Sequence, residues 1–353
     1  MSALPGADPV ELRVQAQHLA MDTIWEAEST AIRWLQGAGD PLSYPLGLIT
    51  HLGSQGVIIV LMAAVFWCVN PGLGARLLVA VIASGAVNGL LKSVSYTPRP
   101  YWFDAQITGY SHHGSFGMPS GHSQAAMVAW GYLGIRSGRR ALMWAAAVII
   151  PLVGFSRIYL GAHFFSDVVV GLSIGALILW LMLRFEDRVL TWWSSLDTTR
   201  WVSYLLLITL VPCALGAAWQ FGARGDWVPP VTEWIGATPA DPSGHSLAGL
   251  YTASGGLLGG VLGLTLLHRW GWYSAEGTAT ARVSRFALGI SVVVLIVVMD
   301  EVLFGDPGGP IGALSSFVVY AVLALWATYG APRMFVTSGL ATKAQKAERT
   351  DQG

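Results

Sequence analysis

The sequence has 353 residues, of which 54% are hydrophobic and 11% are charged, and its mean hydropathy is +0.55. This composition excludes an ordinary soluble domain and predicts a membrane protein with several spans. The 20 basic and 20 acidic residues balance, so the net charge gives no indication of a nucleic-acid partner.

The N-terminal 53 residues are predicted to form a tail that contains one amphipathic helix. From Asp22 to Gly37, apolar residues recur among charged ones with a helical period, but the segment is too short and too polar to span a bilayer. We expect it to lie along the membrane interface. No basic region followed by an apolar core is present at the N-terminus, so no cleavable signal peptide is expected.

Nine later segments are apolar over the roughly 17–25 residues that a helix needs to cross the hydrocarbon core. They predict an all-α, polytopic transmembrane bundle of about nine spans. The segments centre on residues 54–70, 74–92, 119–135, 141–159, 164–184, 202–220, 244–267, 286–304 and 312–330. Cys68 and Cys213 both lie in apolar stretches, which favours a packing role over a disulfide or a metal site.

Three short motifs follow one another where spans meet loops in the first half of the chain. They are K-x6-RP, then PSGH, then SR-x5-H-x3-D, formed by Lys92/Arg99/Pro100, Pro119-Ser120-Gly121-His122 and Ser156/Arg157/His163/Asp167. Any one of them could arise by chance. All three in this order, inside a membrane protein, indicate a common site.

The first and third motifs supply three cations at one membrane face. Lys92 and Arg157 each close a span, and Arg99 follows in a loop. A lone basic residue at a span end usually anchors the helix at the headgroups. Three that converge are instead suited to a phosphate, whose oxygens gain charge as a P–O bond breaks. We therefore assign Lys92, Arg99 and Arg157 to phosphate binding.

The PSGH motif begins a span, where helix N–H groups favour an anion. The Ser120 hydroxyl and the Ser120 and Gly121 amides are expected to cap phosphate oxygens. His122 is then placed to protonate the leaving group as a general acid.

His163 opens the next span, and Asp167 lies one turn further on the same helical face. A carboxylate inside an apolar helix is costly unless it has a partner. We expect Asp167 to accept a hydrogen bond from His163 Nδ1–H, which leaves Nε2 free to attack phosphorus. An aspartate that merely caps a packed histidine is the structural alternative.

Together the motifs resemble the signature of the type-2 phosphatidic acid phosphatase superfamily, which includes lipid phosphate phosphatases and undecaprenyl-pyrophosphate phosphatases. The resemblance covers roughly residues 50–185. It implies that His163 is the nucleophile, that a phosphohistidine forms, that His122 is the general acid and that Asp167 orients His163. The resemblance to its lipid phosphatases also implies that no metal or other cofactor is needed. None is expected here, because His112 and His113 lie in a glycine-flanked loop without further ligands at suitable spacing.

The resemblance divides the chain into four parts. These are the N-terminal tail 1–53, a phosphatase-like catalytic core 54–185, a C-terminal transmembrane module 186–335 and a polar tail 336–353. A second PSGH, from Pro242 to His245, lacks the companion motifs, so we interpret it as a helix N-cap. A second polar site near Asp300 and Glu301 is the alternative. Small residues after this motif predict close helix packing, which would shape a route for lipid or the face of a homodimer.

The distribution of basic residues predicts the orientation of the bundle. If the motif loops share one side, 14 of the 20 basic residues fall on the opposite side, which marks that side as cytoplasmic. The site would then face the periplasm or exterior of a bacterial inner membrane. The 14 residues are Arg76, Arg136, Arg139, Arg140, Arg184, Arg188, Arg200, Arg269, Arg282, Arg285, Arg333, Lys343, Lys346 and Arg349.

The sequence therefore favours an integral membrane phosphatase that acts on lipid phosphate or pyrophosphate headgroups, such as a polyprenyl diphosphate, phosphatidic acid or phosphatidylglycerophosphate. Its partners would be a lipid substrate and the bilayer, with no nucleic acid. Two alternatives stay open. One is a phosphotransferase that passes the phosphoryl group from His163 to a lipid or sugar acceptor, and the other is a lipid transporter or scaffold with a relic catalytic core.

Overall fold

The computed structural model describes residues 9–37, 39–224, 228–230, 234–303, 305 and 309–344, and in the first helix it describes side chains from Met21 onward. Within these ranges the regular structure is helical, and the one β-bridge joins Tyr273 to Lys343. The structure confirms the predicted all-α bundle. The predicted polar tail beyond residue 344, with Lys346 and Arg349, lies outside the described residues.

Helices of the first half carry the three motifs at their ends. They are α1 (Pro9–Gln36), α2 (Ser43–Thr50), α3 (Gln55–Ala64) with a following π-turn (Val65–Val69), α4 (Pro71–Ser95), α5 (Pro100–Phe103), α6 (Gly121–Arg136), α7 (Arg140–Tyr159) and α8 (Phe165–Ser195). The helices of the second half are α9 (Thr198–Ala218), α10 (Pro242–Trp270), α11 (Ala279–Leu303), α12 (Gly309–Leu325) and α13 (Ala331–Thr337).

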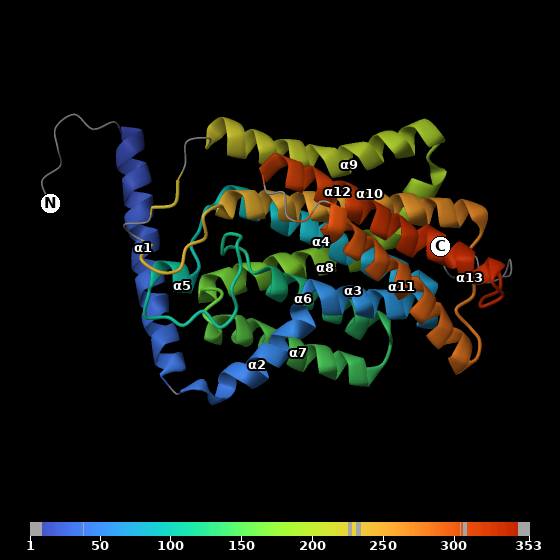
Figure 1. Ribbon diagram of the computed structural model, residues 1–353, viewed down its shortest axis with the longest axis horizontal. Helices are drawn as coiled ribbons and strands as arrows, with labels where there is room; N and C mark the ends of the chain where they lie inside the picture. The colour runs from blue at the N-terminus through green and yellow to red at the C-terminus, as the bar shows by residue number, and fades with distance from the viewer. Residues whose placement is uncertain are drawn as a thin grey trace, which may run out of the picture.

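The long helices run side by side, with the motif-bearing loops gathered at one end of the bundle (Figure 1). Successive helices alternate in direction, so the C-terminus of α4, the N-terminus of α6, the C-terminus of α7 and the N-terminus of α8 all reach that end. Helix α1 crosses the same end, roughly perpendicular to the bundle. The alternation explains how Lys92 near the end of α4, His122 at the start of α6 and His163 in the loop before α8 reach one place.

Seven of the described helices are long and apolar enough to cross a membrane, or eight if the bent pair Asp40–Gly53 and Gln55–Val69 is one span. The predicted number of about nine is therefore higher than the described helices support. The difference lies in the segments 54–70 and 119–135, which form α3 with its π-turn and α6. Helix α6 has 16 residues, about 24 Å at 1.5 Å per residue, whereas the hydrocarbon core is ~30 Å thick.

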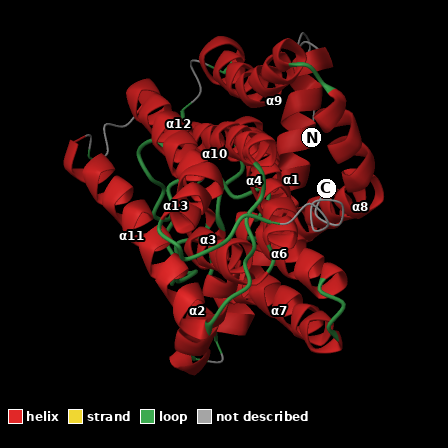
Figure 2. Cartoon of the chain, turned by 90° about the vertical axis from the view of Figure 1, so that its right-hand side faces the viewer, coloured by secondary structure: helices red, strands yellow, loops and turns green. Residues whose placement is uncertain are grey.

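Glycines let α10 pack closely against helices of both halves. A Cβ atom on Gly89 of α4 would lie 2.6 Å from the Leu250 Cα of α10, and one on Gly255 of α10 would lie 2.0 Å from the Phe317 carbonyl oxygen of α12. These distances leave no room for a side chain, so the small residues do promote close helix packing. Seen along the bundle, α4 and α10 lie near its centre (Figure 2). The C-terminal helices therefore form one body with the motif-bearing half.

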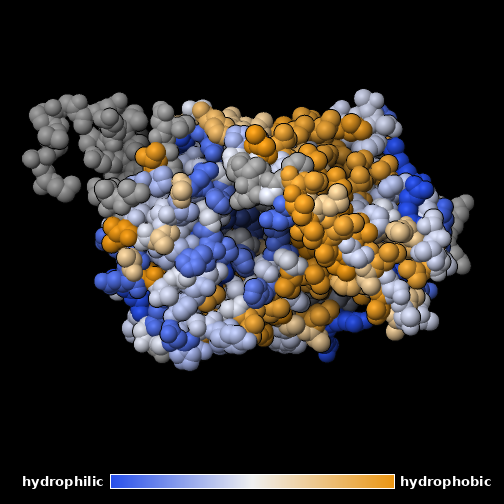
Figure 3. Space-filling view, viewed as in Figure 1, coloured by the Kyte–Doolittle hydropathy of each residue, from blue (hydrophilic) through white to orange (hydrophobic). Residues whose placement is uncertain are grey.

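Hydropathy divides the surface along the bundle axis. Apolar residues gather over α11 and α12, whereas the end with α1 and the motif loops is largely hydrophilic (Figure 3). A hollow lies at the border between the two regions in this view. This distribution is expected when one end of a bundle meets water or headgroups and the flank meets lipid.

Helix α1 packs on protein through its apolar face. Trp25 and Ile32 are buried in a cluster with Trp102, Phe116 and Phe164 from the motif loops. Trp34, on the opposite side of α1, is 78% exposed. The apolar face of this amphipathic segment, on the Trp25 side, thus packs against the motif loops of the same chain. Contact with the lipid interface alone does not explain the pattern.

Candidate active site

Three cations of the first and third motifs are buried at the same end of the bundle. Lys92 is 8% exposed, Arg99 is 2% exposed and Arg157 is fully buried. Among the described residues none of them forms an ion pair with a carboxylate, and Asp167 is the buried carboxylate of the same motifs. Buried positive charges without counter-charges are costly, so this arrangement is suited to an anion that carries about two negative charges.

His163 and Asp167 form the contact that their spacing predicts. His163 Nδ1 lies 3.2 Å from Asp167 Oδ2, and the Phe164 backbone N–H donates to the same oxygen at 3.1 Å. Asp167 is thereby fixed at the start of α8, where it also satisfies a helix N–H group. The contact places the proton of the neutral His163 ring on Nδ1 and leaves the lone pair on Nε2.

Arg99 lies against the second ring nitrogen of His163, with Nη1 3.2 Å from Nε2. The other N–H groups of Arg99 donate to the Ala162 carbonyl, to the carbonyl and hydroxyl of Ser115, and to the Phe116 carbonyl, at 2.7–3.1 Å. All five guanidinium donors thus have partners. A phosphate bound by Arg99 must displace one of them, and attack by His163 requires that the displaced partner be Nε2.

Lys92 holds the loop that connects the first two motifs. Its Nζ donates to the carbonyl oxygens of Phe116 at 2.5 Å and of Gly117 at 2.8 Å. Two of the three ammonium hydrogens are used in this way. The backbone carbonyls of residues 115–117 therefore accept hydrogen bonds from Lys92 and Arg99 and hold these two cations close together.

Arg157, like Lys92, has hydrogen-bond donors beyond those that its partners among the described residues use. Its Nη1 donates to Thr50 Oγ1 at 2.9 Å, and its Nη2 lies 2.7 Å from His113 Nε2. The buried Nε has no hydrogen-bond partner among the described residues. Nε and Nη2 form one edge of the guanidinium, and such an edge can bind two oxygens of a phosphate side by side.

Ser120 does not present its amide as we predict from the PSGH motif. Its N–H donates to the Asp167 backbone carbonyl at 3.0 Å, and its fully buried hydroxyl pairs with Ser123 as the N-cap of α6. A helix start needs these bonds, and they take the groups that a phosphate would use. Ser120 thus ties α6 to α8, while Gly121 and His122 line the adjoining cavity.

Burial and neighbouring charges keep His163 and His113 neutral. Burial, then the charges of Arg99 and Lys92, lowers the pKa of His163 well below its usual range. Burial and the charges of Arg99 and Arg157 lower the pKa of His113 to about 2. His113 therefore accepts a hydrogen bond from Arg157, and its ring lies 5.7 Å from that of His122, centroid to centroid.

Two groups of residues around the site are missed by sequence reasoning. The first is the loop with His113, Ser115 and Phe116, where the glycines give the available signal: a Cβ atom on Gly117 would lie 2.4 Å from the Pro98 carbonyl oxygen. The second is α1, where Glu28 accepts hydrogen bonds from the Ser166 amide at 3.0 Å and hydroxyl at 3.1 Å. Burial raises the pKa of Glu28.

The second PSGH motif reaches the same loop. Asp241 caps α10 by accepting from the Gly244 N–H at 2.7 Å, as the predicted N-cap requires. The next turn contacts residues 114–116: a Cβ atom on Gly114 would lie 2.5 Å from the His245 ring, and Ser246 Oγ accepts from the Phe116 N–H at 3.2 Å. Asp300 and Glu301, at the end of α11, are not among the residues that line the cavity beside the site.

Two protein-family models match the chain, and the first of them covers the three motifs. The family model of the PAP2 superfamily matches residues 73–190, which contain all three motifs. The model described as PAP2 superfamily phosphatase, transmembrane extension, matches residues 251–343. The chain belongs to the PAP2 superfamily. The second match begins within α10 and ends at Lys343, which forms the β-bridge with Tyr273 between α10 and α11. It therefore covers the helices from α10 to α13, so the C-terminal helices of this PAP2 protein correspond to a recognised extension.

Similar proteins support the membership. The PAP2 protein described here is 29% identical over 154 residues to phosphatidylglycerophosphatase B of Bacillus subtilis (strain 168), which covers 40% of this chain and 73% of that protein. It is 31% identical over 106 residues to undecaprenyl-diphosphatase BcrC of the same organism, covering 30% and 54%, and 34% identical over 100 residues to dolichyldiphosphatase of Saccharomyces cerevisiae, covering 26% and 42%. In the last two comparisons the match spans about half of the relative.

A solved structure also matches. The crystal structure of the first transmembrane PAP2 type phosphatidylglycerolphosphate phosphatase from Bacillus subtilis shares 26% sequence identity with this chain, with a TM-score of 0.41. The match covers 51% of this chain and 96% of that one.

Proposed function

We propose that this PAP2 protein is an integral membrane phosphatase that hydrolyses the phosphate or diphosphate headgroup of a lipid through a phosphohistidine. One observation carries the proposal. Three buried cations converge beside a neutral histidine, His163, whose Nδ1 is held by Asp167 and whose Nε2 faces Arg99. A phosphate bound there would meet both the charge that stabilises its transition state and a nucleophilic nitrogen.

The first step transfers the phosphoryl group to the protein. His163 Nε2 attacks phosphorus, the N–P bond forms and the P–O bond to the lipid breaks. His122, protonated when the negative charge of the bound phosphate lies beside it, donates this proton to the departing oxygen. Asp167 stabilises the positive charge that develops on the His163 ring. Lys92 and Arg157 bind the equatorial oxygens, and Arg99 exchanges its bond to Nε2 for one to the phosphate.

The second step releases the group to water. His122, now unprotonated, accepts a proton from a water molecule that attacks phosphorus, and the N–P bond breaks to give inorganic phosphate and neutral His163. Because the same intermediate would react with another hydroxyl, a phosphotransferase differs only in the acceptor.

The relatives suggest the first substrates to test. They are named for phosphatidylglycerophosphate, undecaprenyl diphosphate and dolichyl diphosphate, and a bundle with apolar flanks favours such lipids over soluble esters. The excess of basic residues at the opposite end supports a site on the outer side of a bacterial inner membrane.

The test is phosphate release by the purified protein in detergent, in the presence of EDTA, from a panel of lipid phosphates and diphosphates. We expect release that His163→Ala abolishes, and a covalent phosphoenzyme that is acid-labile and base-stable, as a phosphohistidine is. Release that persists in His163→Ala would overturn the nucleophile. Release only when a lipid or sugar alcohol is supplied, with the phosphate recovered on that alcohol, would establish the phosphotransferase.

A further inference from the structure

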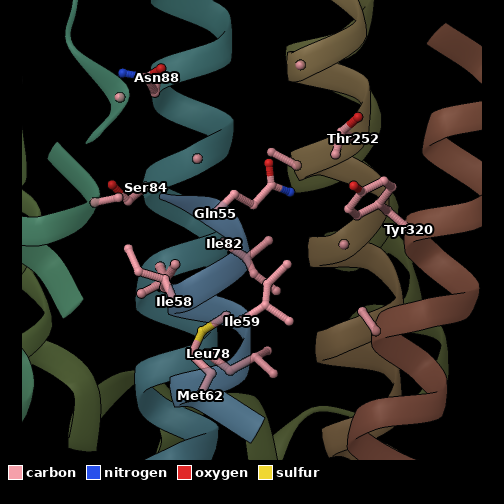
Figure 4. Close-up of a pocket in the computed structure, with 18 of the residues that line it drawn as sticks. Gln55, Ile58, Ile59, Met62, Leu78, Ile82, Ser84, Asn88, Thr252 and Tyr320 are labelled. Carbon is pink, nitrogen blue, oxygen red and sulfur yellow. The ribbon is translucent and has the colours of Figure 1, made fainter. Parts of the chain in front are cut away.

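A cavity of about 530 Å³ lies between the motif-bearing helices and the C-terminal helices. Its walls come from α3, α4 and α6 on one side and from α10, α11 and α12 on the other. Figure 4 shows Gln55 and Ile59 of α3 facing Thr252 of α10 and Tyr320 of α12 across this space. The volume is within the ~300–1,000 Å³ that ligand pockets occupy.

The two ends of the cavity differ in chemistry. At the motif end the lining includes Asn88, Lys92, His122 and His245, whereas the other end is lined by apolar side chains such as Leu78. Figure 4 shows the change: Asn88 and Thr252 lie at one end, and Met62 and Leu78 lie at the other. A molecule that fits this gradient has a polar group at the motif end and an apolar chain below it.

The cavity continues into the candidate active site. Lys92 and His122 belong to both, and Lys92 donates to the Phe116 carbonyl, which also accepts a hydrogen bond from Arg99. A group attached to a phosphate at this site thus has a path between the two halves of the bundle.

The length of the cavity suits a lipid chain. Lys92 and Leu78 both line it, and they are 14 residues apart on α4, a distance of about 21 Å at 1.5 Å per residue. One leaflet of the hydrocarbon core is ~15 Å thick. The lining thus extends beyond the depth that a short chain would reach.

The wall contributed by α10 leaves this space open. His245, Gly249, Thr252 and Gly256 of α10 all line the cavity, and they recur at the spacing of one helical face. A Cβ atom on Gly249 would meet no atom within 4 Å. This glycine therefore borders empty space, unlike Gly255, which packs against α12.

We propose that this cavity binds the hydrocarbon chain of the lipid whose phosphate is cleaved, so that the C-terminal extension forms half of the chain-binding site and selects long-chain substrates. The inference rests on the proposed function for the identity of the headgroup. Because Lys92 and His122 line both the cavity and the candidate active site, we assign the cavity to the chain of the substrate itself and not to a separate lipid.

Gly249→Leu tests the proposal by filling the open space without a backbone clash. We expect kcat/KM for a long-chain lipid phosphate to fall at least about tenfold, because a misplaced substrate loses its near-attack position. Activity on a short-chain, water-soluble analogue of the same headgroup should stay within about twofold of the unmodified protein. The matched control is Gly56→Leu on α3, where an added Cβ also meets no atom within 4 Å but which does not line the cavity. Equal loss on both substrates, or no loss on the long one, would overturn the proposal.

A second measurement separates chain binding from catalysis. A long-chain lipid phosphate with a photoreactive group near the chain end is irradiated with the His163→Ala variant, and the labelled residues are mapped. We expect labels on residues of the apolar end, such as Met62, Leu78 or Ile82, and their reduction in His163→Ala/Gly249→Leu. Labels confined to the outer faces of α9 or α11 contradict the inference. Labels in the cavity, combined with no phosphate release by the unmodified protein from any lipid tested, would sustain the chain site and reject the proposed function.

Discussion

The Ser246 hydroxyl of the C-terminal half accepts a hydrogen bond from the Phe116 backbone N–H at 3.2 Å, and the Phe116 carbonyl accepts from both Lys92 and Arg99. Ser246 is 1% exposed and also donates to the Pro242 carbonyl at 2.8 Å. The second PSGH helix therefore positions the loop that orders two cations of the site. A helix cap far along the chain thus contributes to the geometry of the first half.

Ser246→Ala should lower kcat/KM about five- to tenfold, because loss of the hydrogen bond from the buried Phe116 N–H to Ser246 costs about 1–3 kcal/mol and the loop relaxes away from Lys92 and Arg99. Ser246→Thr, which keeps the hydroxyl, should restore most of the activity. Steady-state kinetics with a lipid phosphate measures both, and Ser291→Ala on α11 is the control. Equal activity in the Ala and Thr variants would show that the hydroxyl has no positioning role.

Arg157→Lys keeps the charge but removes the planar edge that includes the unpartnered Nε. We expect kcat/KM to fall about 10- to 100-fold and inhibition by inorganic phosphate to weaken, because lysine acts as a point charge and cannot bind two oxygens side by side. Arg136→Lys, at the other end of the bundle where Arg136 pairs with Glu186, is the matched control. Unchanged phosphate inhibition in Arg157→Lys would remove Arg157 from the phosphate site.

The protonation of His163 gives a prediction about pH. Because burial and the charges of Arg99 and Lys92 lower its pKa, the ring should lose its proton at a pH below the ordinary value of about 6.5. The neutral ring, with its lone pair on Nε2, then persists at neutral and mildly acidic pH. NMR of protein with ¹⁵N-labelled histidine, assigned with His163→Asn, measures the midpoint.

Arg99→Gln should move the same midpoint upward, because it removes the largest opposing charge. A midpoint in the folded protein at or above that of the unfolded chain would contradict the expected environment of His163.

Helix α1 supplies a prediction about the support of the site. Trp25 is 6% exposed and stacks on Phe164, the residue next to His163, with centroids 6.1 Å apart. Trp25→Ala should weaken the docking of α1 by about 3–5 kcal/mol and lower activity by freeing the start of α8. Hydrogen exchange of residues 164–168 should rise with it. Trp34→Ala on the exposed side of α1 should change neither exchange nor activity, and an equal effect of both variants would contradict the assigned contact.

Much of the site was readable because its chemistry is encoded locally. The i, i+4 spacing of His163 and Asp167 places them on one face of a helix start, and the order of motifs at span ends places Lys92, Arg99 and Arg157 at one end of the bundle. Helical periodicity and apolar length also determined the all-α membrane fold, because a span satisfies its own backbone hydrogen bonds. These properties depend on short stretches of chain.

Tertiary structure decided what depends on contacts between distant residues. The Ser120 amide went to the Asp167 carbonyl, the donors of Arg99 were filled by residues 115 and 116, and α1 docked on Phe164. The cavity below Lys92 arises because α10 packs against α4 while α3 stands away from α12 around residues 55 and 320. No local pattern specifies such pairings. Which acceptor a buried donor binds, and which side chains line a cavity, are determined only when the helices pack against one another.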